Sequence, residues 1–315
     1  MNGRISATPF FSIVIGVYND WTPLDGCLAS LAEQGGAPTF EVIVVDDGSD
    51  EPAPESIRHW AESYPLIVSR QAHSGVASAR NRGVQMSSGS VLVFVDADCR
   101  LDSNCLAALS STLATLPHTD CFQLRLVGDR KTFVGKIEDL RLATLQDHLR
   151  QSNGCIRYLN TAGFAIRRSR VKSDGFAFDP AAVRAEDTLV LANLMESGEL
   201  PLFATESVVE HSVSLSLTDF FLKGIWSAYQ EGRTYDVIAL KGVKVRASHR
   251  ERLSMLLAMW KTSKEERIGS LACCVLVARQ SLRLLVSFAY RFLRGVAQHT
   301  YLDKVFWKAS SPRRI

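Results

Sequence analysis

Three apolar segments constrain the fold of this chain more than any other feature. Phe11–Tyr18, Phe40–Val45 and Ser90–Val95 are rich in Val and Ile and almost free of polar residues, as is typical of strands buried on both faces of a parallel sheet. The apolar spacing between them predicts three helices and a short strand: Pro23–Gln34, Glu55–Tyr64, Val76–Met86 and Leu66–Ser69. This alternation predicts a doubly wound α/β fold with a ligand crevice at the carboxyl ends of the strands.

Missing motifs disfavour two common nucleotide-binding folds. No G-x-G-x-x-G follows the first apolar segment and no G-x-x-x-x-G-K-S/T occurs in the chain, which argues against dinucleotide-binding and P-loop domains. The seven cysteines form no C-x-x-C pair, which argues against a structural zinc site and a disulfide framework. Because the polar stretch Met1–Pro9 also lacks the apolar run of a signal peptide, we expect a cytoplasmic protein.

Charges are unevenly distributed along the 315 residues. The net charge is only +3, but residues 241–315 contain 16 Lys and Arg against 4 Asp and Glu, a balance of +12. Residues 1–240 have a balance of −9. This asymmetry predicts a folded domain over 1–240 and a basic, helical extension over 241–315 that meets an anionic surface. No nucleic-acid-binding motif accompanies the basic residues, so we expect no nucleic-acid partner.

The extension contains a segment, residues 268–296, with the pattern of an amphipathic helix. On a helical wheel, basic side chains share an arc of about 120°: Arg279, Arg283, Arg291 and Arg294. The other side is apolar: Leu282, Leu285, Phe288, Ala289, Phe292, Leu293 and Val296. The longest uncharged run, 268–278, is too short to span a bilayer. We expect this helix either to lie in the interface of an anionic membrane or to pack on the protein's own core.

Acidic residues follow two of the three apolar segments. Asp46-Asp47 come after Phe40–Val45, and Asp96-Ala97-Asp98 come after Ser90–Val95. Both pairs are expected at one edge of the sheet, because the carboxyl ends of parallel strands meet there. Mg²⁺ and Mn²⁺ prefer carboxylate and phosphate oxygens, whereas a single Asp at a strand end often only caps a turn or helix. Two acidic strand ends together favour a site for a divalent cation and a diphosphate.

Five motifs occur in an order and at spacings that resemble one family of sugar-transferring enzymes. They are Phe11–Asn19 (FSIVIGVYN), Glu41–Asp50 (EVIVVDDGSD), Gly75–Gly83 (GVASARNRG), Val93–Asp98 (VFVDAD) and Ala185–Asp187 (AED). As a set they resemble the family 2 inverting glycosyltransferases of the GT-A fold, over about Phe10 to Tyr235. The resemblance implies a Rossmann-like mixed sheet flanked by helices. It also implies that residues 10–100 bind a nucleotide sugar and that residues 101–240 form the acceptor half.

The resemblance implies that the donor's nucleobase lies at the ends of the first two strands. Gly16, Val17 and Tyr18 would line the pocket, with Tyr18 close to the base. Asp46 or Asp47 would hydrogen-bond the base or the ribose, and a simple turn or cap is the alternative for both. The donor would be a nucleoside-diphosphate sugar, and UDP is the nucleotide that this family uses most.

The resemblance implies that the phosphates and a metal ion lie at the next strand. Arg80 would lie opposite the phosphates, although an arginine on a helix can also be simply exposed. Asp96 and Ala97 would contact the ribose or the donor sugar, and Asp98 would ligate Mn²⁺ or Mg²⁺. His211 would complete the metal site or contact the diphosphate, although a single histidine is more often structural.

In the family the acidic pair of the fifth motif supplies the catalytic base, which falls here on Asp187, with Glu186 supporting it or touching the acceptor. Such a pair at a helix start can also act only on the helix dipole. An inverting transfer is a single displacement, so it needs a carboxylate that takes the acceptor's proton and a metal that stabilises the leaving diphosphate. On the acceptor side the resemblance points to Gly163, Phe164 and Trp226; a strand bulge and a core aromatic are the alternatives.

These features predict a metal-dependent inverting glycosyltransferase that moves one sugar to an acceptor hydroxyl in bacterial cell-surface glycan or polysaccharide biosynthesis. The acceptor would be a glycan, a lipid-linked glycan or a protein. No Q-x-x-R-W motif is present, which favours a single transfer over polymerisation. One alternative is a sugar-phosphate nucleotidyltransferase, which would carry a Gly-rich, basic loop where this chain has Tyr18–Pro23. The other is a non-catalytic, transferase-like membrane scaffold.

Overall fold

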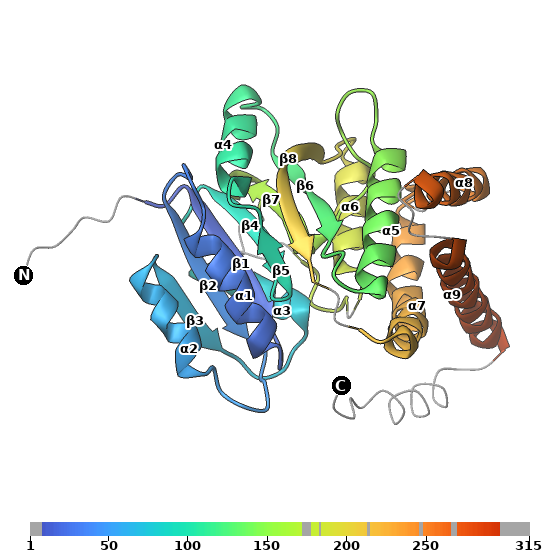
Figure 1. The fold of residues 1–315 in the computed structure, drawn as a ribbon, viewed down its shortest axis with the longest axis horizontal. Helices are drawn as coiled ribbons and strands as arrows, with labels where there is room; N and C mark the ends of the chain where they lie inside the picture. The colour runs from blue at the N-terminus through green and yellow to red at the C-terminus, as the bar shows by residue number, and fades with distance from the viewer. Residues whose placement is uncertain are drawn as a thin grey trace, which may run out of the picture.

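The strands form one mixed sheet in the computed structural model, which describes residues 8–171, 178–182, 184–212, 215–245, 248–265 and 270–296. Within these residues the sheet has eight strands in the order β3-β2-β1-β4-β7-β6-β8-β5 (Figure 1). The strands are β1 (Phe11–Val17), β2 (Phe40–Asp46), β3 (Leu66–Arg70), β4 (Val91–Asp96), β5 (Cys99–Leu101), β6 (Cys121–Gly128), β7 (Phe164–Arg167) and β8 (Leu202–His211).

Helices lie on both faces of this sheet, and three more extend the molecule at one end. They are α1 (Trp21–Ala32), α2 (Glu55–Arg58), α3 (Val76–Met86), α4 (Cys105–Thr115), α5 (Phe133–Leu149), α6 (Glu186–Glu196), α7 (Leu217–Leu240), α8 (His249–Glu265) and α9 (Ser270–Val296). This arrangement is the predicted GT-A type of architecture, a mixed sheet flanked by helices with a mainly helical C-terminal part.

The parallel half of the sheet confirms the prediction from the three apolar segments. β3, β2, β1 and β4 run parallel, and the register pairs Val17 with Asp46 and Gly16 with Asp96. Ile13 and Ile15 belong to the core that includes the leucines of α1, whereas Val14 between them packs with α3. Since successive residues of a strand point to opposite faces, β1 buries side chains on both, and its one polar side chain, Ser12, donates a hydrogen bond to the Glu41 carboxylate (2.6 Å).

The other half of the sheet differs from a simple doubly wound pattern. β7 runs antiparallel to β4 and β6, and β5 runs antiparallel to β8. The predicted strands Leu202–Thr205 and Val208–His211 are one strand, because β8 keeps pairing with β6 across an irregularity between Leu124 and Arg125. The three-residue β5 was not predicted, since it is too short to show an apolar period.

Two other predicted elements differ at their ends. The helix predicted over Glu55–Tyr64 is split into α2 and a 3₁₀ turn over His59–Glu62. The strand predicted over Thr161–Arg167 begins with a 3₁₀ turn, and only β7 is extended. Asn160 causes this turn, because its side-chain oxygen accepts a backbone hydrogen bond two residues later.

The C-terminal helices pack on α5 and α7 at the end of the molecule farthest from α2 and β3 (Figure 1). A core of their own joins Ile137 of α5, Phe220 of α7 and Met259 of α8 to the Ala272, Cys273 and Leu276 side chains of α9. α8 and α9 are therefore part of the folded body rather than a detached tail.

The basic side of α9 faces the protein. Arg279 donates from Nε to the Phe220 carbonyl oxygen (3.1 Å), and its guanidinium lies 4.1 Å from the centre of the Phe220 ring. Arg283 donates to both carboxylate oxygens of Glu231 at 2.7 and 2.8 Å. This part of α9 therefore packs on the protein's own body, and these two arginines bind α7. The side chains of Arg291, Leu293, Arg294 and Val296 lie outside the part that the structure describes.

The contact between β1 and α3 allows no side chain at Gly83. A Cβ atom added there would lie 2.4 Å from Cγ1 of Val14. We expect Gly83→Ala to lower the free energy of unfolding by about 1–3 kcal/mol in urea denaturation, because β1 and α3 must move apart. Gly35→Ala is the control, since its Cβ would meet only the Ser103 carbonyl oxygen at 3.8 Å. Equal effects of the two substitutions would contradict this account.

Candidate active site at the carboxyl ends of the parallel strands

The register of the parallel strands brings the predicted donor-side residues to one edge. Val17 is opposite Asp46 and Gly16 is opposite Asp96, so the chain segments that follow β1, β2 and β4 leave the sheet side by side. Gly16 itself lies under α3, where its Cβ position is 3.5 Å from Cβ of Ala79. Gly16 and Val17 are thus part of the floor of this edge rather than its exposed surface.

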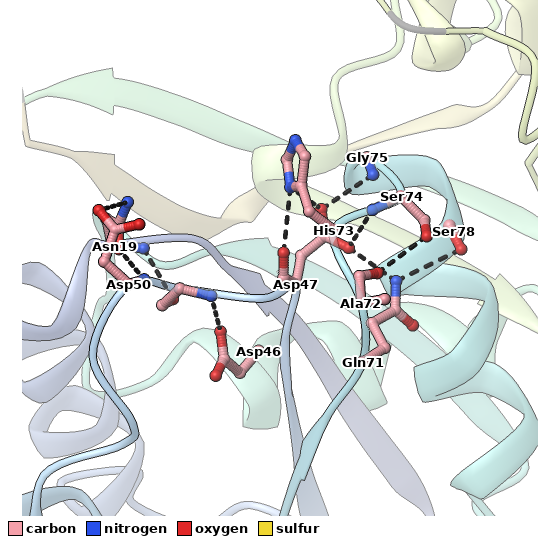
Figure 2. A network of polar contacts seen from close by, with 11 residues as sticks. Asn19, Asp46, Asp47, Asp50, Gln71, Ala72, His73, Ser74, Gly75 and Ser78 are labelled. Carbon is pink, nitrogen blue, oxygen red and sulfur yellow. Dashed lines mark hydrogen bonds and ion pairs between the residues drawn. The ribbon is translucent and has the colours of Figure 1, made fainter. Parts of the chain in front are cut away.

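Asp47 fastens the segment before α3 to the end of β2 (Figure 2). One carboxylate oxygen accepts hydrogen bonds from Gln71 Nε2 (2.7 Å) and the Ser74 backbone N–H (3.0 Å), and the other accepts from the Gly75 N–H (2.8 Å). His73 Nδ1 lies 2.9 Å from the second oxygen. Asp47 therefore orders the turn that leads into α3, and its negative charge lies near the helix N-terminus.

Asp46 has a different environment from Asp47, and Figure 2 shows the two carboxylates pointing apart. Asp46 accepts a hydrogen bond from the Ser49 backbone N–H (2.8 Å), and Nε of Arg70 lies 3.5 Å from its other oxygen. Its side chain is only 2% exposed. Both candidates for contact with the base or ribose are thus buried, Asp46 in its own turn and Asp47 against the segment before α3.

Two aromatic rings stand together at this edge. The Tyr18 and His73 rings lie 4.4 Å apart at an interplanar angle of 33°, and both side chains are exposed. Exposed aromatic rings offer a flat surface on which a nucleobase can stack. The sequence predicted Tyr18 at this edge but not His73. The position of His73, two residues before Gly75 at the start of the third motif, could have indicated that it lies near the site.

Asp98 and His211 meet although they are more than a hundred residues apart in the sequence. β5 and β8 pair so that Cys99 is opposite His211, and this brings His211 Nε2 to 3.3 Å from a carboxylate oxygen of Asp98. Burial would raise the pKa of Asp98, but the hydrogen bond and charge of His211 outweigh it and lower the pKa. The same contact raises the pKa of His211, although burial opposes it.

These residues have the donor atoms of a divalent-cation site. Ligand atoms of Asp98, Cys99 and His211 lie within 4.8 Å of one another. Burial raises the pKa of the Cys99 thiol well above its usual value, so the thiol stays protonated and is a poor ligand. The remaining carboxylate and imidazole fit Mn²⁺ or Mg²⁺, which leave coordination positions open for phosphate oxygens.

Arg80 connects the donor-side carboxylates with the acidic pair on α6. Its two terminal nitrogens donate to Asp96 and to Glu186, each over 2.6 Å, and the guanidinium lies 5.6 Å from the centre of the Phe178 ring. The side chain is 3% exposed, so the alternative of an exposed helix arginine is wrong. Arg80 brings the Asp96-Ala97-Asp98 segment and the Glu186-Asp187 pair into one site.

The acidic pair begins α6 directly after a residue with unusual backbone geometry. Ala185 has φ +59°, a left-handed conformation that alanine rarely adopts. Asp187 accepts hydrogen bonds from the Thr188 backbone N–H (2.6 Å) and hydroxyl (3.1 Å). Burial and the negative charge of Glu186 raise the pKa of Asp187 to about 7, the range in which a carboxylate works as a general base.

The three acceptor-side candidates have separate environments. Phe164 is buried and stacks on Phe94 in the core, with ring centres 6.2 Å apart, so its side chain offers no surface to an acceptor. Gly163 is required by packing, because a Cβ there would lie 2.8 Å from Leu126. The Trp226 ring of α7 lies under the Arg184 guanidinium, 4.9 Å from it to the ring centre. Arg184 precedes Ala185, so it is close in the chain to the acidic pair.

Comparison with known sequences assigns the chain to a family. The family described as "Glycosyl transferase family 2" matches residues 12–175. An uncharacterized glycosyltransferase, YibD, of Escherichia coli is 35% identical over 95 residues, and glycosyltransferase AglE of Haloferax volcanii is 36% identical over 97 residues. Each alignment covers 30% of this chain and, respectively, 27% and 32% of the relative. The aligned part thus spans less than a third of either curated relative.

Solved structures share the fold at low sequence identity. TarS 1–349 of S. aureus in complex with UDP has a TM-score of 0.53 and 18% identity, covering 92% of this chain and 93% of that one. The mannosyltransferase PcManGT of Pyrobaculum calidifontis, in complex with GDP-Man and Mn²⁺, has a TM-score of 0.56 and 19% identity, covering 96% and 84%. The sequence match, the mixed sheet and the strand-end site agree: the chain belongs to glycosyltransferase family 2 and has the GT-A fold.

Proposed function

We propose that this protein is a metal-dependent inverting glycosyltransferase that moves one sugar from a nucleoside-diphosphate sugar, most readily a UDP-sugar, to an acceptor hydroxyl. The observation that carries the proposal is the pair of Arg80 hydrogen bonds, which joins the Asp96-Ala97-Asp98 segment to the Glu186-Asp187 pair. A donor-side metal site and a general base are then neighbours. Structural relatives whose complexes hold UDP, or GDP-Man with Mn²⁺, support the same class of donor.

The donor would bind with its base at the Tyr18 and His73 rings and its diphosphate toward Asp98 and His211. The exposed rings provide stacking, and the Asp47 hydrogen bonds hold His73 in place. A divalent cation on Asp98 and His211 would supply positive charge against the leaving diphosphate. Asp96, held by Arg80, would face the ribose or the donor sugar.

Asp187 would act as the general base. With a pKa of about 7, a large fraction of its carboxylates is ionised at neutral pH and can still accept a proton with appreciable driving force. It would take the proton of the acceptor hydroxyl as the oxygen attacks the anomeric carbon, and the bond to the diphosphate breaks in the same step. Glu186 cannot turn freely toward the acceptor, because Arg80 holds its carboxylate.

The proposed acceptor is a glycan or lipid-linked glycan of a bacterial cell surface, reached from the cytoplasmic face of the membrane. The absence of the Q-x-x-R-W motif supports a single transfer rather than polymerisation. Trp226, held by Arg184 on the acceptor half, is a candidate surface for sugar stacking. Membership of family 2 disfavours the nucleotidyltransferase alternative. The scaffold alternative is tested by the donor-binding experiment below.

Replacing the proposed base separates catalysis from donor binding. We expect Asp187→Asn to lower kcat for sugar transfer by about 10²–10⁴-fold, because the amide cannot take the proton. Affinity for UDP in calorimetry should stay within about twofold, since Asp187 lies on the acceptor side of Arg80. Asp147→Asn, an equal charge change on the exposed side of α5, is the control. Transfer at the rate of the control variant would exclude Asp187 as the base.

The pH profile reports the same carboxylate. The group is active when deprotonated, so kcat/KM should be level above pH 7 and fall about tenfold per pH unit below it, as Asp187 becomes protonated. UDP binding with Mn²⁺ measured at each pH separates this effect from protonation of His211. A profile that stays level to pH 5 while binding is retained would contradict the raised pKa.

The metal site is tested by donor binding rather than turnover. We expect Mn²⁺ to increase UDP affinity of the unaltered protein in calorimetry, and Asp98→Ala to abolish this increase because the carboxylate ligand is lost. His211→Ala should reduce it in the same direction. Asp147→Asn again serves as the control. An increase of UDP affinity by Mn²⁺ in Asp98→Ala as large as in the unaltered protein would remove Asp98 from the metal site, and no UDP binding by the unaltered protein would favour the scaffold.

A further inference from the structure

The outer face of α9 is a continuous apolar surface. Leu271, Leu285, Phe288 and Phe292 are 62–70% exposed, and Val277 and Leu284 are exposed by more than two fifths. At 100° per residue these side chains fall on one arc of the helix, opposite Arg279 and Arg283. We call this set (Leu271, Val277, Leu284, Leu285, Phe288 and Phe292) the apolar face of α9. Individual exposed leucines are common, whereas a face of this length needs an explanation.

The helix is fixed in this orientation by polar contacts on its inner side. Arg283 is bonded to Glu231 through both carboxylate oxygens, and Arg279 to the Phe220 carbonyl oxygen, both on α7. Turning the apolar face inward would break these bonds and expose their partners. The Tyr290 ring, edge-on to Tyr229 of α7 at 5.5 Å, fixes the far end. α9 therefore keeps its apolar face outward in the folded protein.

By length and composition alone, Ser270–Tyr290 could cross a membrane, with a mean hydropathy of 1.6 and 17% of its apolar window buried. The contacts with α7 argue against a crossing orientation. If α9 crossed a bilayer with its bonds intact, α7 would enter it too, together with charged residues such as Glu231 and Lys223. Such residues are costly in hydrocarbon. A helix with one apolar face and one bonded to its own protein suits a position parallel to the membrane surface.

Charge selects a lipid surface over a second copy of the chain. No Asp or Glu occurs from Ile268 to Leu302, and residues 241–315 carry a balance of +12. In a two-fold dimer the same patch meets itself, so two such segments would be brought together and repel. An anionic bilayer attracts this charge and also accepts the apolar side chains.

The neighbouring helix α8 also exposes apolar side chains. Leu253, Leu257 and Trp260 form an exposed stripe with i, i+4, i+7 spacing, and the Lys264 ammonium lies 4.9 Å from the centre of the Trp260 ring. A tryptophan beside a lysine is typical of side chains at the boundary between acyl chains and head groups. α8 and α9 lie together at one end of the molecule (Figure 1).

From these contacts we infer that the apolar face of α9 is a membrane-binding surface that inserts into the interface of an anionic bilayer, with α9 lying in the membrane plane. The inference deepens the proposed membrane location and rests on it. It refines the interface alternative expected from the wheel: the apolar side chains enter the lipid, whereas Arg279 and Arg283 secure the helix to α7. α7 begins six residues after His211, so a lipid-borne acceptor would lie one helix from the site.

Vesicle co-sedimentation of the full chain tests this surface. We expect binding to vesicles of phosphatidylglycerol and phosphatidylethanolamine, and a loss of about tenfold or more in the bound-to-free ratio for Leu285→Gln/Phe288→Gln, since both side chains lose apolar contact with lipid. Leu116→Gln, an exposed leucine after α4, is the control for Leu285→Gln and should bind like the unaltered chain. Thermal melting verifies that each variant is folded.

Three results would overturn the inference. The first is equal vesicle binding by the double variant and the unaltered chain. The second is full release of the unaltered chain by 1 M salt, which would indicate adsorption through basic residues alone. The third is a vesicle-free dimer that the double variant converts to a monomer, which would assign the face to a second copy. The assay uses no donor or acceptor, so UDP binding can succeed while vesicle binding fails, and the two proposals remain distinguishable.

Discussion

The candidate site depends on one buried positive charge, the guanidinium of Arg80. Three carboxylates, Asp96, Glu186 and Asp187, converge around Arg80, and burial together with the negative charge of Glu186 raises the pKa of Asp187. The Arg80 guanidinium satisfies two of them at once because its rigid, planar fork can donate in two directions, which a lysine ammonium on a flexible stem does less well. The third, Asp187, has no such bond and keeps the raised pKa of about 7. A single arginine thus divides the acidic cluster into two carboxylates in ion pairs and one, Asp187, outside them.

A second group of buried charges supports the metal side. Glu138 of α5 accepts two hydrogen bonds from Arg141, and although burial would raise its pKa, the positive charges of Arg141, His211 and Arg279 lower it to about 2. Glu138 therefore remains ionised, and its charge acts on both the proposed metal ligand of β8 and an arginine of α9. Arg279 and Arg283 of α9 face inward, toward the negative charges of Glu138 and Glu231.

Much of the fold and of the candidate site could be predicted, because it depends on the local sequence pattern. β1, β2 and β4 are apolar at nearly every position, as is typical of parallel strands buried on both faces, so the strands and their acidic ends follow from the sequence. The outward face of α9 could not be predicted in the same way. A helical wheel gives the angle between side chains but not which side meets a partner, and the partners of Arg279 and Arg283 lie on α7. The burial of the Phe164 ring could not be predicted for a similar reason, since it depends on the register of β7 with β4.

The pairing of β8 with both β5 and β6 has a consequence for the modularity of the family. The segment matched to the family ends at residue 175, before Glu186 and His211. A polypeptide cut there would keep the loops after β1 and β2, yet Arg80 would lose one of its two acidic partners and β6 a strand along its edge. The two halves of the sheet are thus joined by side-chain contacts across the candidate site. If recombination exchanged the second half of the sheet between relatives, the new half would have to keep the partners of Arg80 and Asp98, which are Glu186 and His211. The residues between Glu186 and His211 would then be the ones free to vary.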